Sequence, residues 1–440
     1  MRKMLVLGMI LFAAPAFFTP PLSGAQSLKA DAPTASIQDD SILRQSIKDR
    51  WLTASPAQVL KNKPFIYNLP GGVPVQVRSG GRGDEFMVIL ARERNGTYTG
   101  TAQGSWIYTR KVTTGEAERI RVFLRSDPLA YVQFRPLGRD RSLMDVVLHE
   151  AYVIRGLALG VPFDRLLVIP LEEALAFAGE RFPRRYFDPD PRQYRNIRAF
   201  VSRIRAGLPG LAFQDDGALD ENGRYVFIEN LRPQGEDPGL NCSGFAKWVV
   251  DGMLRPVTGQ RLAIAPLKAP VTPRTSSLAA NFENRDSLFG LDWTRNLALE
   301  AARVLRSSSF ARVENVEVRR ESFASLIDRS RGSAAIKNYP GFLLNAGFSL
   351  EGIRPLLYTL AIDEPGCLYL ASVNNERPTV PPQRQHYHVA VLVPYFSETG
   401  VFQVAVFESA AETGLTGFIG RHPNAMVNLV RIPVEGSFEP

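Results

Sequence analysis

The segment that most constrains how this chain can fold is the run of β-forming residues at 386–393, His-Tyr-His-Val-Ala-Val-Leu-Val. It is entered from a Pro381-Pro382 loop, and its unbroken apolar second half is typical of a strand in the middle of a sheet. A second apolar run, Val401–Phe407, follows after a turn near Pro394–Gly400, which predicts a hairpin. We therefore expect an antiparallel sheet with residues 386–393 as a central strand.

Two histidines and a glutamate on these strands are candidates for chemistry. The two-residue period of a strand places His386 and His388 on the same face. Glu408 ends the second strand, from which its carboxylate can reach an imidazole and fix its tautomer. The alternatives are a surface histidine pair, a zinc-binding pair and a solvated strand-end glutamate. Because no further ligand set accompanies the histidines, we expect no metal site.

Cys242 lies at the start of a predicted helix. Pro238-Gly239 marks a break before it. Apolar residues recur at helical spacing after it, at Phe245, Trp248, Val249 and Met253. A helix N-terminus carries partial positive charge and free N–H groups, which favour a thiolate and can stabilise an oxyanion. Ser243 and Gly244 are small, so we expect room for a substrate beside the sulfur. The alternative is a buried structural cysteine.

The composition is that of a globular protein with a substantial core. The chain has 440 residues, of which 45% are hydrophobic and 22% charged, and its length indicates two or three domains. Its net charge of +8 favours an anionic partner such as cell wall or lipid headgroups, but the basic residues are scattered and no nucleic-acid surface is expected. Two cysteines, Cys242 and Cys367, are too few for a disulfide scaffold, and no cofactor is expected.

The N-terminal residues 1–25 have the features of an export signal. Arg2 and Lys3 precede an apolar run at Met4–Phe18, and Ser23 and Ala25 are small residues before a cleavage point. No cysteine follows the run, so no lipid anchor is expected, and no later stretch is apolar enough to span a membrane. We therefore expect a secreted or periplasmic protein, with an uncleaved anchor helix as the alternative.

Between this signal and the cysteine helix, the chain divides into three predicted parts. Residues 26–60 are polar and predict a linker with one helix near Ser41–Leu52. Residues 61–138 contain five or six short strands separated by Gly, Asn and Asp, which predicts a small, SH3-like β-barrel. Residues 139–190 have helical apolar spacing and predict a helical connector, after which Tyr194–Ala206 is a predicted amphipathic helix.

The cysteine and histidine segments resemble the NlpC-type papain-like cysteine peptidases, which are bacterial cell-wall hydrolases. The family's nucleophile lies in an Asp-Cys-Ser-Gly-Phe/Leu-Val helix start, to which residues 241–246 are similar. Its base lies in a His-Val-Gly/Ala-Ile/Val strand, to which residues 388–391 are similar. The family's Pro-Gly-Asp-Leu turn is similar to residues 365–368, with cysteine in place of the aspartate. The resemblance implies that Cys242 is the nucleophile and that His388, not His386, is the base.

The resemblance also implies a third residue and substrate contacts. The family's third polar residue lies in a Phe/Ile-His-Ala-Ser context, and the similar position here is Glu408. A family tyrosine upstream of the cysteine matches Tyr225, and Asn241 and Ser243 flank the nucleophile, so these three are the implied substrate-binding residues. Asn241 replaces an aspartate with which the family recognises a free substrate amine. We therefore expect a substrate without that amine.

The predicted fold class is α+β, with a papain-like catalytic domain at 191–440 in which the cysteine helix packs on the antiparallel sheet. Cys242 and His388 lie 146 residues apart, farther than is usual in the family, so residues 255–354 are expected to be an insertion. The insertion contains two predicted helices, Leu297–Leu305 and Phe323–Ile327. We expect it to shape the substrate cleft, with the catalytic centre formed outside it.

The predicted function is that of a secreted cysteine hydrolase that cleaves stem-peptide amides of peptidoglycan through a thioester. One alternative is an amidase or acyltransferase of the same fold that acts on another amide or on a lipid. A second alternative, from a different class, is a non-catalytic protein that binds the cell wall.

Overall fold

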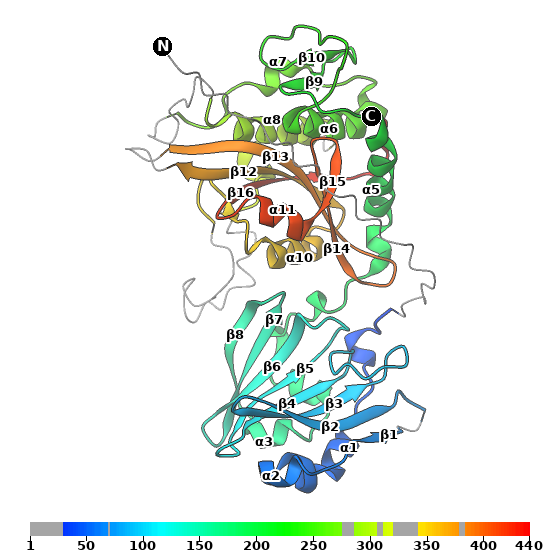
Figure 1. Cartoon of the computed structure of the whole chain (residues 1–440), viewed down its shortest axis with the longest axis vertical. Coiled ribbons are helices and arrows are strands. Elements are labelled where there is room, and N and C mark those ends of the chain that lie inside the picture. Colours follow the sequence, from blue (N-terminus) through cyan, green and yellow to red (C-terminus); the bar gives the residue numbers. More distant parts are fainter. Residues whose placement is uncertain (1–29, 69–70, 275–285, 306–310, 320–341, 378–382) are drawn as a thin grey trace, which may run out of the picture.

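The computed structural model describes residues 30–68, 71–274, 286–305, 311–319, 342–377 and 383–440. Figure 1 shows two domains, an N-terminal antiparallel sheet in blue to cyan and a C-terminal domain in green to red, in which helices cover a second sheet. The predicted export signal at 1–25 lies outside the described residues. None of the described helices has the length and the apolar run that a bilayer crossing requires.

Eight strands form the N-terminal sheet, and each pairs antiparallel with the next strand in the chain. Alternate residues are buried, as in β2, where Val75 and Val77 are fully buried, and in β6, where Val132 and Phe134 are. The expected all-β domain is confirmed, with more strands than the five or six predicted. The strands are β1 (Phe65–Tyr67), β2 (Val75–Arg82), β3 (Glu85–Arg92), β4 (Trp106–Lys111), β5 (Ala117–Val122), β6 (Ala130–Leu137), β7 (Arg141–Leu148) and β8 (Ala151–Leu159).

The last two of these strands lie where a helical connector was predicted, and that prediction is wrong. Only short helices follow them, α3 (Phe163–Leu166) and α4 (Leu171–Ala176). The pairing of β7 with β8 shifts register next to Asp145, which breaks the alternation that identifies a strand. Asp145 is fully buried and accepts hydrogen bonds from Arg135 at 2.7 and 3.0 Å and from the N–H of Gly156 at 2.7 Å. The irregular strand pair thus encloses a charged residue that the helical spacing does not predict.

The segment predicted as a linker packs against the N-terminal domain from its first described residues. The expected helix is present as α1 (Ser41–Ser46) and a helical turn at Lys48–Leu52, followed by α2 (Pro56–Val59). Leu43 and Trp51 are each 1% exposed. The polar composition of the segment hides this packing, because only a few apolar residues make it. Leu43, Ile47, Trp51, Leu52 and Val59 are buried, whereas Ile42 is exposed.

The C-terminal sheet has six antiparallel strands in the order β11-β16-β12-β13-β14-β15. The predicted strand 386–393 lies within β13, between β12 and β14, so its central position is confirmed. The predicted hairpin is also confirmed, since β13 pairs with β14 from Val391↔Phe407 to Phe396↔Phe402. The strands are β11 (Phe348–Ser349), β12 (Cys367–Arg377), β13 (Gln383–Phe396), β14 (Phe402–Glu408), β15 (Ala411–Gly414) and β16 (Met426–Pro433).

Helices α6 and α8 lie side by side on one face of this sheet, and α10 lies on the opposite face (Figure 1). The predicted helix near residues 194–206 is confirmed as α5, with its four expected apolar residues buried. The remaining two-stranded sheet pairs β9 (Gly217–Leu219) with β10 (Tyr225–Phe227). The helices are α5 (Arg195–Gly207), α6 (Cys242–Thr258), α7 (Ile264–Leu267), α8 (Phe289–Leu305), α9 (Val313–Val316), α10 (Ile353–Asp363) and α11 (Leu415–Arg421).

The segment predicted as an insertion, 255–354, contributes to the core of the C-terminal domain. The helix expected at Leu297–Leu305 is the second half of α8, whose Trp293 and Leu297 are fully buried against α6 and the sheet. The other expected helix, Phe323–Ile327, lies outside the described residues. Part of the segment predicted as an insertion thus covers the sheet beside α6. Whether it is an insertion relative to the family stays a prediction.

The two domains meet at the turn between β7 and β8. His149 at its tip lies between Tyr358 of α10 and Phe402 of β14, with ring centroids 4.8 and 5.4 Å apart. Burial lowers the pKa of His149 to about 4, with Asp127 opposing this effect, so the imidazole is neutral near pH 7. Arg125 lies at the same boundary, over the ring of Phe396. The contact is thus largely aromatic.

Candidate functional site

Cys242 is the first residue of α6, as the sequence predicts. Asn241 is the N-cap, and its side-chain oxygen accepts a hydrogen bond of 2.8 Å from the N–H of Gly244. The N–H groups of Cys242 and Ser243 lie in the first turn, where a helix offers no internal acceptors. The half-buried thiol therefore lies at the positive end of a 17-residue helix.

The small residues after Cys242 are required by packing, contrary to the expectation that they leave room for a substrate. A Cβ at Gly244 would lie 1.9 Å from the carbonyl oxygen of Gly217 in β9, so only glycine fits there. Ser243 is 3% exposed, and its carbonyl accepts a hydrogen bond of 2.9 Å from the indole of Trp293. The start of α6 is thus fixed between β9 and α8, which holds the sulfur in place.

The thiol of Cys242 has a lowered pKa. Burial raises the pKa, but the hydrogen bond and charge of His388, the N–H of Val389 and the hydroxyl of Ser243 lower it by more. The β13–β14 pairing begins at Val391, so the edge of β13 at Val389 is open to the N-terminus of α6. The structure thus places the nucleophile candidate directly against the strand that carries the base candidate.

His388 is held by a carboxylate, as the sequence predicts. Its Nε2 lies 2.7 Å from Oε2 of Glu408, and the guanidinium of Arg421 donates to Oε1 of the same carboxylate. Because Nε2 is engaged by Glu408, Nδ1 is the ring nitrogen that faces the sulfur. Cys242, His388 and Glu408 thus form a chain of contacts in the order expected of a nucleophile, a base and an orienting acid.

His386 and His388 do not share a face of β13, which corrects the expectation from strand period. His388 pairs with Val373 and His386 with the next residue, Asn374, so Tyr387 is an extra residue in a β-bulge. His386 points away from Glu408. It is 5% exposed, and its ring nitrogens bond the hydroxyl of Ser372 at 2.8 Å and the carbonyl of Asn345 at 3.0 Å. Burial lowers its pKa to about 3, so it is a neutral core residue.

The three predicted substrate-binding residues differ from one another in how they lie relative to Cys242. Asn241 borders Cys242 with its side-chain oxygen already engaged as the helix cap, and Ser243 is buried beneath the thiol. Tyr225 lies in β10, paired with Leu219 of β9, and no described hydrogen bond joins it to the Cys242 cluster. Of the three, Asn241 caps the helix that carries the thiol, and a role in substrate binding stays a prediction for all three.

The sequence reasoning missed His422, which follows α11. Its ring stacks on that of His388 at a centroid distance of 5.1 Å and an interplanar angle of 25°. Its Nε2 lies 4.0 Å from Oε2 of Glu408, and its Nδ1 lies 3.1 Å from the hydroxyl of Tyr387. The chain has only four histidines, and this small number is the one feature of the sequence that draws attention to His422. No motif or spacing connects His422 to His388.

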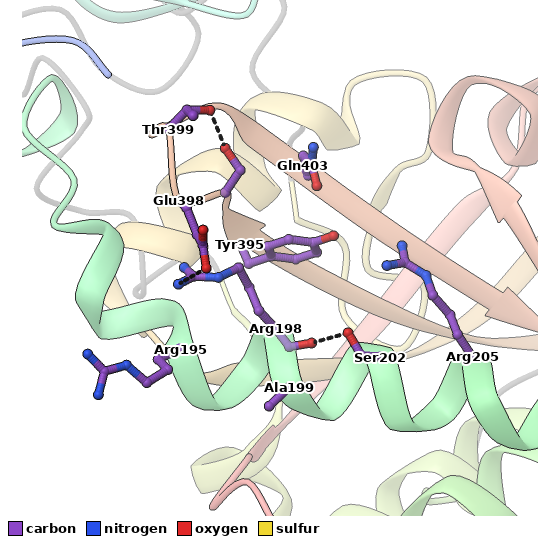
Figure 2. Close-up of a pocket in the computed structure, with 10 residues that line it drawn as sticks. Arg195, Arg198, Ala199, Ser202, Arg205, Tyr395, Glu398, Thr399 and Gln403 are labelled. Carbon is purple, nitrogen blue, oxygen red and sulfur yellow. Dashed lines mark hydrogen bonds and ion pairs between the residues drawn. The ribbon is translucent and has the colours of Figure 1, made fainter. Parts of the chain in front are cut away.

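A separate groove of about 600 Å³ lies along α5. Figure 2 shows Arg198 and Arg205 of α5 with Tyr395 and Glu398 from the β13–β14 hairpin. The groove lining contains no thiol, and Tyr395 is seven residues beyond His388, roughly 23 Å along the strand. Arg205 is also already paired with Glu412 at 2.7 Å. We therefore place the chemistry at Cys242 and not in this groove.

Comparison with known proteins adds information for the N-terminal part only. A family model described as a domain of unknown function, DUF8515, matches residues 33–186. That match spans α1 to α4 and all eight strands of the first sheet, and it ends before Cys242, His388 and Glu408. No curated protein and no solved structure matches the chain. The site must therefore be interpreted from its own chemistry.

Iodoacetamide should alkylate Cys242 at least about tenfold faster than Cys367 at neutral pH. Cys242 is half-buried with a lowered thiol pKa, whereas Cys367 is 8% exposed at the start of β12. Peptide mapping by mass spectrometry measures both rates in one sample. A Cys367→Ala variant serves as the control and should label at the same rate as the parent protein. Faster modification of Cys367 would contradict the assignment of the nucleophile.

Proposed function

We propose that this protein is an exported cysteine hydrolase that cleaves an amide bond in the stem peptide of peptidoglycan. The observation that carries the proposal is the thiol of Cys242, at a helix N-terminus, beside an imidazole that Glu408 orients. The proposal includes a papain-like identity for the C-terminal domain, supported by a cysteine helix packed on an antiparallel sheet, and an SH3-like identity for the N-terminal domain.

The mechanism begins with attack of the Cys242 thiolate on the amide carbonyl carbon, which forms a C–S bond and moves an electron pair to oxygen. The N–H groups of Cys242 and Ser243, in the first turn of α6, are the proposed donors to this oxyanion. Protonated His388 gives its proton to the leaving amine as the C–N bond breaks, and a thioester remains. His388 then deprotonates a water that attacks the thioester, which releases the carboxylate and regenerates the thiolate.

Asn241 supports a substrate that lacks a free amine next to the scissile bond. A neutral amide in this position has no charge to pair with an ammonium, and its oxygen is held by the N–H of Gly244. Without Arg2 and Lys3 of the expected signal the net charge is 8 − 2 = +6, which also suits the anionic cell wall. We therefore expect acylated stem peptides to be cleaved in preference to those with a free N-terminal amine.

Digestion of purified peptidoglycan followed by mass spectrometry of the soluble products tests the proposal. We expect new muropeptide termini from the parent protein and none from Cys242→Ala, which should retain the fold because alanine also fits a first helical turn. Synthetic stem peptides with free and with acylated N-termini, compared by rate, test the expected preference. Binding to the wall without any product, by both proteins, would instead indicate a non-catalytic wall-binding protein.

A further inference from the structure

Three metal-ligating side chains converge beside Cys242. His388 of β13, Glu408 of β14 and His422 after α11 each offer one ligand atom, and these atoms all lie within 4.8 Å of one another. The proposed mechanism uses His388 and Glu408 but assigns no role to His422. Two imidazoles and a carboxylate are a ligand set that zinc accepts.

His422 has the surroundings of a histidine held in place for a ligand. Phe418 packs edge-on against its ring at 5.1 Å, and the hydroxyl of Tyr387 bonds its Nδ1 at 3.1 Å. Its Nε2 is buried and has no hydrogen-bond partner in the described part of the chain. A buried nitrogen without a partner is costly, so its retention next to a carboxylate requires an explanation. A fixed Nδ1 with an available Nε2 is the arrangement of a metal-binding imidazole.

The distances suit a tetrahedral ion after small movements. Zinc bonds of 2.0–2.1 Å at tetrahedral angles place ligand atoms about 3.4 Å apart. Here Oε2 of Glu408 lies 2.7 Å from Nε2 of His388 and 4.0 Å from Nε2 of His422, on either side of that value. Arg421 bonds the other carboxylate oxygen, Oε1, so Oε2 remains available to an ion. The positive charge of Arg421 repels a divalent ion, and this repulsion limits the affinity of the site for zinc.

We propose that His388, Glu408 and His422 form a binding site for Zn²⁺, with water as the fourth ligand. The zinc site itself does not depend on the proposed hydrolase activity, but the inhibition that would follow from zinc binding does. A zinc ion on Nε2 of His388 prevents that imidazole from carrying a second ring proton, because the metal occupies the nitrogen that Glu408 otherwise serves. The proton transfers in the thioester mechanism then stop. Zinc is thus an inhibitor of this enzyme, released by a chelator.

Calorimetric titration of the chelator-treated full chain with Zn²⁺ measures the site directly. We expect one ion per chain for the parent protein and at least tenfold weaker binding for His422→Gln. Cys242→Ala should bind zinc as the parent does, since the sulfur is not a ligand. His149→Gln, a change at a buried histidine in the domain contact, is the matched control and should also bind as the parent does.

Cobalt substitution gives a second readout that does not depend on activity. Co²⁺ in this site should show the visible absorption of a tetrahedral ion with nitrogen and oxygen ligands, without a thiolate charge-transfer band. Loss of binding in Cys242→Ala with no change in His422→Gln would overturn the proposed site in favour of a simple cysteine–histidine pair. If zinc binds as proposed but does not slow peptidoglycan cleavage, the inhibitory role is wrong. If no cleavage occurs at all, only the hydrolase proposal fails.

Discussion

Replacement of His388 by alanine should lower kcat/KM on the cleaved stem peptide by roughly 10³-fold or more, because the base and the nucleophile act as one unit. The imidazole lowers the thiol pKa, and in the proposed mechanism it also transfers the proton, so its loss removes both effects. His386→Gln should change kcat/KM by less than about tenfold, although it is only two residues away. Steady-state kinetics with one substrate compares both variants with the parent protein.

The two variants are expected to differ strongly in activity because the β-bulge at Tyr387 places His386 and His388 on opposite faces of the sheet. His386 bonds Ser372 and Asn345 inside the core, so its replacement should lower the melting temperature more than the activity of the folded protein. Circular dichroism of both variants gives that melting temperature. Equal losses of kcat/KM in two fully folded variants would show that His388 has no special role.

Asp251→Asn should lower the free energy of unfolding by about 3–5 kcal/mol, the second large effect we expect. Lys247 and Asp251 lie one turn apart in the middle of α6, at 0% and 1% exposure, with 2.6 Å between ammonium and carboxylate. Burial lowers the pKa of Lys247, which shows how strongly the site opposes a charge without its partner. Urea denaturation followed by circular dichroism measures the loss.

Two further variants identify the cause of that loss. Lys247→Met with Asp251→Asn removes both charges and should recover most of the stability. Glu173→Gln breaks an exposed ion pair with Arg165, both partners at least 41% exposed, and should cost less than about 1 kcal/mol. If the double variant is no more stable than Asp251→Asn, the loss comes from the 2.9 Å hydrogen bond of Asp251 to the N–H of Leu262 and not from the unpaired ammonium.

The elements around the site were predictable where local pattern and tertiary structure agree. Cys242 begins an amphipathic helix, and residues 386–393 of β13 are rich in β-forming residues, so the sequence predicts both elements. The pairing of His388 with Glu408 follows from a hairpin with a short turn. These features depend on neighbours in the chain, which is why one sequence suffices for them.

Other features depend on contacts that no local pattern records. A single extra residue at Tyr387 changes which face His386 occupies, yet the composition of the strand does not change. The register shift beside Asp145 makes β7 resemble a helix in its apolar spacing. His422 and Arg421 reach Glu408 only because α11 folds back over β14. The role of Gly244 likewise becomes evident only once β9 lies against it.

Cys242 and His388 are separated by 146 residues of sequence, and this separation determines at which stage of folding the site can form. Closing so long a loop costs chain entropy before any contact between its ends is gained. Much of the enclosed chain must fold at the same time, since α8 packs on both α6 and β13. A partly folded chain therefore has the thiol of Cys242 but no imidazole beside it. The lowered pKa that His388 gives this thiol arises only with the completed fold.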